Sequence, residues 1–321
     1  MNEMLKKIGD IGIIPVIKID EPEKAVPLAK ALCDGGLPLA EITFRTACAG
    51  EAIASITKAL PDMIVGAGTV LTIDQVKAAL DAGAKFIVSP GINPKVVTYC
   101  VERGIPVTPG CSNAADIELA LELGMDVVKF FPAEAAGGLK MIKALSAPFS
   151  SLKFIPTGGI DETNLLSYLS FDKILACGGS FMVKEEYIKS GDFGKITALT
   201  SLAVRNMLGF TLAHVGINCA DEAEAASGAA KLDGLFGFEV KNGNSSIFSA
   251  ALFEWMKKPG AGKNGHIAIG VNFMARAIAY LKSKGVEFVE PSPKPAEGVV
   301  PSAIYIKGEI SGFAFHLVQK K

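Results

Sequence analysis

The chain has 321 residues, of which half are hydrophobic and a fifth charged, so it can form two domains with sizeable cores. The net charge of −1, without long runs of like charge, argues against binding to nucleic acid or an acidic membrane surface. Six scattered cysteines without a CxxC pair favour reduced thiols. The N-terminal MNEMLKKIGD lacks an apolar signal core, and the uncharged run 206–220 is too short to span a membrane. We therefore expect a cytoplasmic protein.

Helical segments alternate with short apolar strands over about the first two hundred residues. Four of these helical segments end on glycine, which suits a left-handed helix cap, and Thr72 to Gln75 form a capping-box pattern. Eight strands are expected, at 13–18, 39–44, 64–70, 86–91, 105–110, 127–132, 153–159 and 173–179.

Eight such units predict an α/β fold, a compact (β/α)₈ TIM barrel, over residues 1–206. The alternative is an open doubly wound sheet, which needs fewer strands and usually has a glycine-rich loop after its first strand. Here the glycine pairs follow strands seven and eight instead, which favours the barrel.

The second strand carries polar residues on one face. Period-two alternation places Glu41, Thr43 and Arg45 together, with Ile42 and Phe44 opposite. In a barrel the apolar face packs against helices, so the polar side chains point inward, where they need partners or a ligand. An edge strand with one solvated face is the alternative. The glycines of 66–70 leave space nearby, and Thr69 falls at the catalytic end of its strand.

Lys129 lies in the apolar strand 127–131. Burial of an ammonium favours the neutral amine, which is the form that attacks a carbonyl to make a Schiff base. Taken alone, this strand favours a lysine that merely reaches water at the strand end, and the rest of the chain reverses that preference. Glycine pairs at 158–159 and 178–179 close the last two strands, where backbone N–H groups of a barrel commonly bind phosphate. A single glycine pair would indicate only a turn.

Seven phrases resemble the 2-dehydro-3-deoxy-6-phosphogluconate (KDPG) and 4-hydroxy-2-oxoglutarate (KHG) aldolase family. They are EITFRT (41–46), GAGTV (66–70), SPG (89–91), PGCS (109–112), KFFPAE (129–134), PTGG (156–159) and GGS (178–180).

The resemblance implies a class I aldolase, a homotrimer that needs no cofactor and acts on a 2-keto acid or sugar phosphate. Lys129 would form the Schiff base, Glu41 would shuttle protons and Arg45 would hold the carboxylate derived from pyruvate. The remaining implied binding residues are Thr43, Thr69, Pro90, Phe131, Thr157, Gly158, Gly159, Gly178, Gly179 and Ser180.

Residues 207–321 have a different texture and repeat loosely. Residues 212–218 parallel 265–271, and each segment precedes a helical stretch and short strands. This pattern predicts a smaller α+β domain of two βαβββ modules, which resembles the glyoxalase-like, or vicinal-oxygen-chelate, fold. The resemblance implies metal ligands in the first and last strands of each module.

The matching positions are His214, Glu254, His266 and His316, a set of donors that suits a divalent metal. Many metal-binding members of that fold carry glutamate where His316 stands, and three structural histidines are the alternative interpretation. Three functions are therefore compared: an aldolase with an appended domain, a keto-acid or phosphosugar sensor without turnover, and a bifunctional protein with a second activity on a keto acid or aldehyde.

Overall fold

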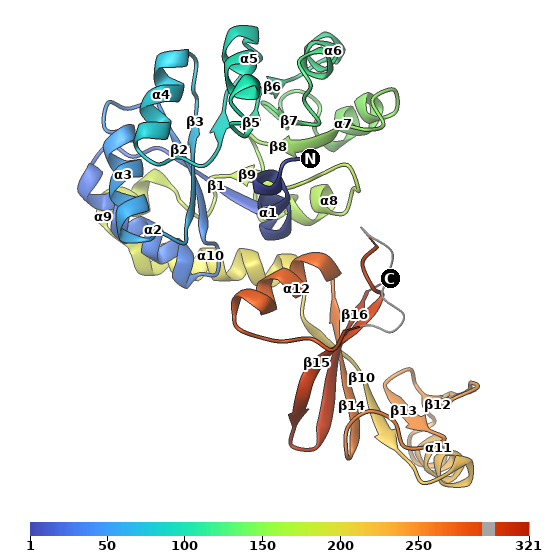
Figure 1. Ribbon diagram of the computed structural model, residues 1–321. Coiled ribbons are helices and arrows are strands. Elements are labelled where there is room, and N and C mark those ends of the chain that lie inside the picture. Colours follow the sequence, from blue (N-terminus) through green and yellow to red (C-terminus); the bar gives the residue numbers. More distant parts are fainter. Residues whose placement is uncertain (291–298, 321) are drawn as a thin grey trace. The chain divides into compact units, whose positions relative to one another are not determined.

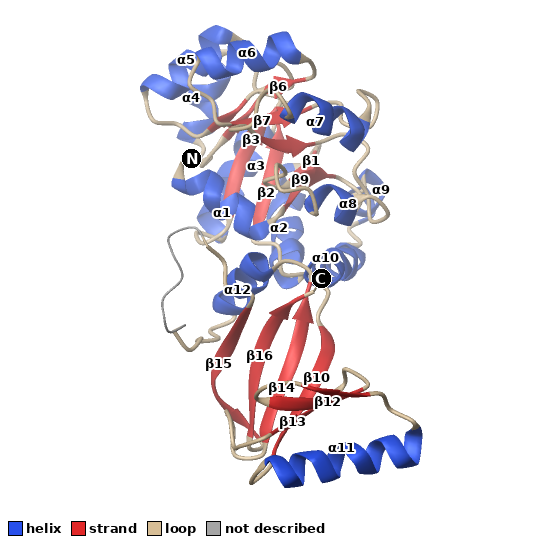
Figure 2. Cartoon of the chain, turned by 90° about the vertical axis from the view of Figure 1, so that its right-hand side faces the viewer, coloured by secondary structure: helices blue, strands red, loops and turns tan. Residues whose placement is uncertain are grey.

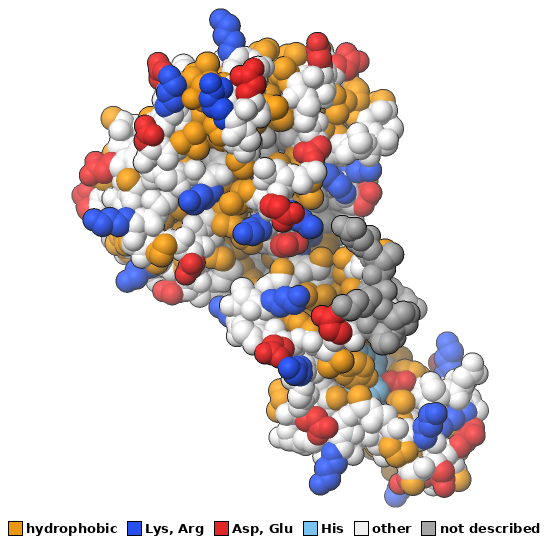
Figure 3. Space-filling model, viewed as in Figure 1, with side chains coloured by type: hydrophobic (Ala, Val, Ile, Leu, Met, Phe, Trp, Pro, Cys, Tyr) orange, Lys and Arg blue, Asp and Glu red, His pale blue; other side chains and the backbone are white. Residues whose placement is uncertain are grey.

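The computed structural model describes residues 1–290 and 299–320. Contacts between Cα atoms divide the chain into two compact units, Met1–Met207 and Leu208–Lys321. None of the helices in the described ranges is long and apolar enough to cross a membrane. On the face drawn in Figure 3, acidic and basic side chains are interspersed.

Parallel strands form a closed ring in the first unit (Figure 1). Isolated β-bridges from Phe154 to Ile174 and from Thr157 to Gly178 join the β8 region to the β9 region. The ring closes where β9 pairs with β1. The strands are β1 (Ile13–Ile17), β2 (Leu39–Thr43), β3 (Ile64–Gly68), β4 (Ile87–Val88), β5 (Val107–Thr108), β6 (Gly110–Cys111), β7 (Val127–Phe130), β8 (Lys153–Pro156) and β9 (Cys177–Gly179).

Helices surround this ring (Figure 2), as the TIM-barrel prediction requires. Thr72 caps its helix by accepting a hydrogen bond from the Gln75 amide, as the capping-box pattern predicts. Gly36, Gly83, Gly104 and Gly124 all have positive φ angles. The helices are α1 (Glu3–Ile11), α2 (Ala25–Asp34), α3 (Ala49–Ala59), α4 (Ile73–Asp81), α5 (Pro94–Glu102), α6 (Ala114–Glu122), α7 (Gly138–Ser146), α8 (Leu165–Leu169), α9 (Glu185–Ser190) and α10 (Phe193–Leu208), with a 3₁₀ turn at Pro22–Lys24.

The strands are shorter than the sequence pattern predicts, and the fifth is interrupted. Pro109 separates β5 from β6 because it has no amide hydrogen to donate to a ladder. The Pro109 carbonyl still accepts a hydrogen bond from the Lys129 amide at 2.9 Å, so β5 and β6 together form one strand of the barrel beside β7.

The lower part of the barrel interior is apolar. Leu39 and Val127 lie in one buried cluster with Phe86 and Ile155, and Leu5 and Ile8 of α1 pack against them. Leu39 and Val127 precede Glu41 and Lys129 by two residues, so they share the inward face one pleat deeper. The polar pair therefore lies directly above a closed apolar floor.

The second unit contains one sheet, in the order β11-β12-β13-β10-β14-β16-β15. The first strands of the two repeats pair antiparallel in its centre, and each pairs in parallel with the last strand of its own repeat. The elements are β10 (Thr211–Asn218), α11 (Glu222–Phe236), β11 (Val240–Asn242), β12 (Ser246–Ser249), β13 (Phe253–Met256), β14 (Gly265–Val271), α12 (Met274–Ser283), β15 (Ala303–Ile310) and β16 (Phe313–Gln319).

The first repeat is a complete βαβββ module. In the second, the described residues give β14, α12, β15 and β16, with a single bridge between Phe288 and Ile306 where a further strand was predicted. Part of that predicted strand region, residues 291–298, lies outside the described residues.

Candidate active site and histidine cluster

Lys129 and Glu41 form a buried ion pair inside the barrel. The Lys129 Nζ lies 3.3 Å from Glu41 Oε1, and the two side chains are only 7 % and 2 % exposed. The apolar floor beneath them and the parallel strands around them exclude most water. This burial rules out, for Lys129, the interpretation of a strand-end lysine that reaches solvent.

Two glycines of β3 leave space inside the barrel, Gly68 for the Glu41 carboxylate and Gly66 for the Phe86 ring. A Cβ atom at Gly68 would lie 2.2 Å from Glu41 Oε1, and one at Gly66 would overlap the Phe86 ring. Both glycines pair with inward positions of β2, Glu41 with Gly66 and Thr43 with Gly68. The carboxylate is thus accommodated only because β3 lacks side chains there.

A pocket of about 500 Å³ lies next in the barrel, and its lining includes the neighbours Thr43 and Phe131 but neither Glu41 nor Lys129. Thr43 and Phe131, the next inward positions after Glu41 and Lys129, form its floor. Thr43 donates its hydroxyl to the Ile17 carbonyl at 3.0 Å. Six further predicted residues line this pocket, namely Arg45, Thr157, Gly158, Gly159, Gly179 and Ser180.

The loop after β8 is oriented for an anion. The Ala133 amide donates to the Thr157 carbonyl at 2.8 Å, and the Glu134 amide donates to the Gly158 carbonyl at 3.0 Å. Because C=O and N–H point in opposite directions across a trans peptide, the amides of Gly158 and Gly159 point away from that segment. Both glycines line the pocket, so these N–H groups are available to a bound anion.

The Thr157 hydroxyl is buried and has no hydrogen-bond partner among the described residues. It lies where a Cβ at Gly178 would come within 2.3 Å of its oxygen, which explains why that position is glycine. Thr157 lines the pocket as a residue, but this oxygen is itself buried and lies against Gly178.

Three predicted binding residues do not line this pocket, namely Thr69, Pro90 and Gly178. Thr69 has a φ of 57°, a strained conformation for a β-branched residue, and directly follows β3. Pro90 brings its carbonyl so close to Gly110 that a Cβ there would lie 2.1 Å from the oxygen. Gly178 instead lies beneath Thr157, so its role is to admit that side chain.

Charged residues that the sequence analysis did not select also line the pocket, namely Lys18, Asp161, Lys184 and Glu185. Lys18 pairs with Asp20 at 3.0 Å and with Glu185 at 3.8 Å. The hydrogen bond to Asp20, with the negative charges of Asp20 and Glu185, raises the pKa of Lys18, so this ammonium stays charged. These residues do not form a sequence motif, because they lie in segments that follow different strands of the barrel.

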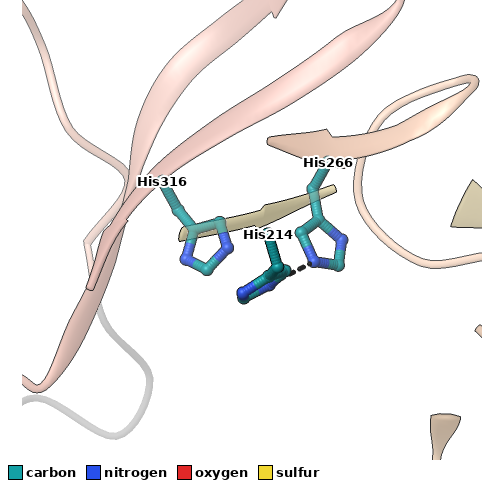
Figure 4. A group of neighbouring side chains, drawn as sticks. All are labelled: His214, His266 and His316. Carbon is teal, nitrogen blue, oxygen red and sulfur yellow. Dashed lines mark hydrogen bonds between the residues drawn. The ribbon is translucent and has the colours of Figure 1, made fainter. Parts of the chain in front are cut away.

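In the second unit, the three histidines of the chain converge (Figure 4). His214 lies on β10, His266 on β14 and His316 on β16, and a ligand atom from each falls within 4.8 Å of the others. His214 pairs with Ala268 as His266 pairs with Gly216, which relates the two strands by a local twofold axis. Glu254 and His316 occupy equivalent places on β13 and β16, opposite Gly216 and Ala268.

Glu254 completes the cluster. Its Oε2 lies 3.0 Å from His266 Nε2 and 3.2 Å from His214 Nε2, and the two Nε2 atoms are 3.2 Å apart. Ligand atoms that share one ion at about 2.0–2.1 Å are separated by about 3.0–3.4 Å, so this spacing suits a common metal. The hydrogen bonds from His214 and His266 lower the pKa of Glu254, which stays ionised.

His316 supports the same interpretation. Both its ring nitrogens are buried without a hydrogen-bond partner in the part of the chain that the structure describes. Burial lowers the pKa of His316 to about 4, and the electrostatic effect of the nearby His266 and His214 acts in the same direction. The ring is therefore neutral at neutral pH. A neutral imidazole is the form that binds a metal ion.

Three neighbours of the cluster were missed by the sequence analysis. Ser246 donates its hydroxyl to Glu254 Oε1 at 2.7 Å and fixes the carboxylate. Gly216 leaves room for the His266 ring, since a Cβ there would lie 2.1 Å from its Cε1 atom. Tyr305 stacks on His316 with ring centroids 4.7 Å apart. Their positions depend on cross-strand register, which the sequence pattern does not specify.

A buried lysine beside a carboxylate, near a glycine-lined pocket at the carboxyl end of a parallel barrel, is the arrangement of a class I, Schiff-base aldolase. The family model for KDPG and KHG aldolase matches residues 3–199, and the chain belongs to this family. This confirms the family resemblance and the lyase class inferred from the sequence. The family model ends before the second unit begins at Leu208.

Individual relatives agree over the barrel. A 2-dehydro-3-deoxy-phosphogluconate aldolase of Treponema pallidum is 50% identical over 200 residues, covering 62% of this chain and 95% of that protein. The KHG/KDPG aldolase of Escherichia coli K12 is 43% identical over 192 residues, covering 60% of this chain and 90% of that protein.

A solved KDPG aldolase from Legionella pneumophila, with pyruvate captured as a covalent carbinolamine intermediate, is 39% identical. Its TM-score is 0.61, and the match covers 62% of this chain and 97% of that one. A Zymomonas mobilis 2-keto-3-deoxy-6-phosphogluconate aldolase with 3-phosphoglycerate is 41% identical, with a TM-score of 0.59 and coverage of 62% and 94%.

Proposed function

We propose that the barrel cleaves 2-dehydro-3-deoxy-6-phosphogluconate to pyruvate and glyceraldehyde 3-phosphate, and 4-hydroxy-2-oxoglutarate to pyruvate and glyoxylate. The observation that carries the proposal is the buried pair of Lys129 and Glu41, whose side-chain atoms lie 3.3 Å apart. The nearby pocket is lined by Gly158, Gly159 and Gly179, whose backbone amides could bind a phosphate. The Legionella relative, which holds pyruvate as a carbinolamine, and the Zymomonas relative, which holds 3-phosphoglycerate, support the same substrate class.

The reaction begins when the Lys129 ammonium passes a proton to Glu41 and the neutral amine attacks the carbonyl at carbon two. Glu41 returns that proton to the departing hydroxyl, which leaves as water, and a protonated imine and the Glu41 carboxylate remain. Glu41 takes the proton from the hydroxyl on carbon four, the bond between carbons three and four breaks, and its electron pair enters the imine. The aldehyde departs and an enamine remains. Glu41 then returns a proton to carbon three, and hydrolysis frees pyruvate and Lys129. The imine is the electron sink, so this chemistry requires no metal ion.

The residues that line the pocket support one orientation of the substrate. Arg45 lies beside Thr43 on the pocket wall and offers a bidentate fork to the carboxylate next to the imine. The amides of Gly158 and Gly159, together with Gly179 and Ser180, take the terminal phosphate.

A direct assay tests this function. Purified chain incubated with either substrate should release pyruvate, which lactate dehydrogenase reports through NADH consumption. We expect turnover with both substrates and a higher kcat/KM for the phosphorylated one. Binding of both compounds without release of pyruvate would instead identify the barrel as a keto-acid or phosphosugar sensor.

We propose in addition that the enzyme is a cytoplasmic homotrimer, as its resemblance to the family implies. Exposed apolar side chains on the barrel helices, such as Val101, Met141 and Leu202, offer surface that an interface between copies would cover. Analytical ultracentrifugation gives the number of chains directly.

For the second unit we propose a divalent metal site held by His214, His266, His316 and Glu254. The observation that carries it is the buried His316 ring, whose two nitrogens have no hydrogen-bond partner among the described residues. It lies beside three donor atoms that are 3.0–3.2 Å from one another. Three imidazoles and a carboxylate suit zinc, nickel, iron or manganese. A bound metal would supply Lewis acidity, and Ser246 would hold the Glu254 carboxylate in place.

Metal analysis of the full chain tests this proposal. After dialysis with added zinc, nickel, manganese or iron, the chain should retain about one equivalent of one of them. His266→Ala should lose it, because the ring contacts both Glu254 and His214, whereas Glu239→Ala, an exposed carboxylate of the same unit, should keep it. Stoichiometry near zero in the folded wild-type chain contradicts the site. A chelator should strip the metal and leave cleavage by the barrel intact.

A further inference from the structure

A buried phenol and a carboxylate beside the anion-binding loop take no part in the mechanism above. Tyr168, on α8, is only 2 % exposed, and its hydroxyl donates a hydrogen bond to Glu134 Oε1. Burial, followed by this hydrogen bond and the nearby carboxylate charge, raises the pKa of Tyr168, so the phenol keeps its proton. The bond joins the segment after β7, which carries Lys129, to the helix after the glycine loop.

Glu134 contacts the loop in two ways. Its backbone amide donates to the Gly158 carbonyl at 3.0 Å, which turns the Gly159 N–H in the opposite direction. Its side-chain carbons pack over Gly159, where an added Cβ would lie 2.6 Å from Glu134 Cγ. Gly159 has a φ of 85°, a conformation that glycine adopts readily and other residues rarely do.

The other side of the loop is held as well. Asn164 donates its side-chain amide to the Gly159 carbonyl at 2.9 Å and accepts from the Asp161 amide at 3.0 Å. Asn164 immediately precedes α8, the helix that carries Tyr168. The glycine loop is thus held on one side by Glu134 and on the other by the start of α8, and the Tyr168–Glu134 bond joins these two supports.

We infer that Glu134 and Tyr168 are positioning residues that hold the Gly158 and Gly159 amides at the geometry a substrate phosphate requires. The inference rests on the proposed function. Neither residue lines the pocket, so each acts through the loop. Their contribution should therefore appear with phosphorylated substrates and be absent from steps that involve pyruvate alone.

Tyr168→Phe removes the donor and retains the ring that fills the core. We expect the KM for the phosphorylated substrate to rise about tenfold, which corresponds to the loss of one hydrogen bond, with kcat nearly unchanged. Exchange of the pyruvate methyl protons, which uses Lys129, Glu41 and Arg45 but not the phosphate end of the pocket, should stay at the wild-type rate. Glu134→Ala should reproduce this split.

Two controls separate positioning from general stability. Glu134→Gln retains a side-chain oxygen that accepts from Tyr168, so its KM should stay within about twofold of wild type. The double variant Tyr168→Phe with Glu134→Ala should be no worse than Glu134→Ala alone, because that single variant already removes the shared bond. Equal losses with phosphorylated substrate and in pyruvate exchange would show a merely structural role, and an unchanged KM in Tyr168→Phe would also overturn the inference. Absence of exchange in the wild-type chain would refute the proposed function itself, a distinct outcome.

Discussion

Lys129→Arg should abolish cleavage of both substrates, with a loss of at least about 10³-fold in kcat. A guanidinium stays protonated at all usable pH values and cannot form the imine, although it keeps the positive charge beside Glu41. Its planar head is also larger than an ammonium, in a space that the apolar floor and Phe131 already confine.

Borohydride reduction in the presence of pyruvate makes the same point chemically. Wild-type chain should gain the mass of one reduced pyruvate adduct on the peptide that contains Lys129, and the corresponding peptide of the Lys129→Arg variant should gain none. Lys153→Arg is the matched control, because Lys153 also lies on a barrel strand but bonds to the Asp172 carbonyl at the surface. An adduct on a different lysine would assign the nucleophile elsewhere.

The barrel and its central pair were predictable because their signals are local. Alternation in residues 41–45 placed Glu41 and Thr43 inward. The strand around Lys129, taken alone, favoured a lysine that reaches water, and only the rest of the chain favoured burial. The pairing of Glu41 with Lys129 joins residues 88 positions apart, and here the family resemblance, together with the strand count, supplied what a single strand could not.

The residues that line the pocket were only partly predictable. The glycine pairs predicted Gly158, Gly159 and Gly179 and the resemblance implied Ser180, and all four line the pocket. Lys18 and Lys184 are ordinary surface residues in the sequence. Gly178 was selected as a binding residue, but its place is beneath Thr157. A glycine required by a neighbouring side chain looks the same in sequence as one required by a ligand.

In the second unit, the repeat predicted which strands carry His214, His266, Glu254 and His316. Their convergence follows from a register that relates the two repeats by a local twofold axis, with Gly216 and Ala268 at equivalent places. Ser246 and Tyr305 could not be anticipated, because they meet the cluster across strand pairs and carry no motif of their own.

Glu41→Gln should lower the rate of pyruvate methyl-proton exchange by about 10²-fold or more. The carboxamide fits the space that Gly68 leaves and can still accept a hydrogen bond from Lys129, but it cannot take up or return a proton. Imine formation with Lys129 should remain detectable by borohydride trapping, because the nucleophile is intact. Cleavage should fall by a similar factor, since removal of the proton from the carbon-four hydroxyl uses the same carboxylate.

The control for this variant is Glu51→Gln, which makes the same substitution at an exposed position on α3 and should change neither rate. Thermal unfolding of both variants separates a loss of chemistry from a loss of fold, because Glu41→Gln also leaves a buried lysine beside a neutral group. Near-normal exchange in a folded Glu41→Gln protein would move the base to another group. The Thr43 hydroxyl, which already donates to the Ile17 carbonyl, is poorly placed to take that role, so a water held at the pocket floor would be the next candidate.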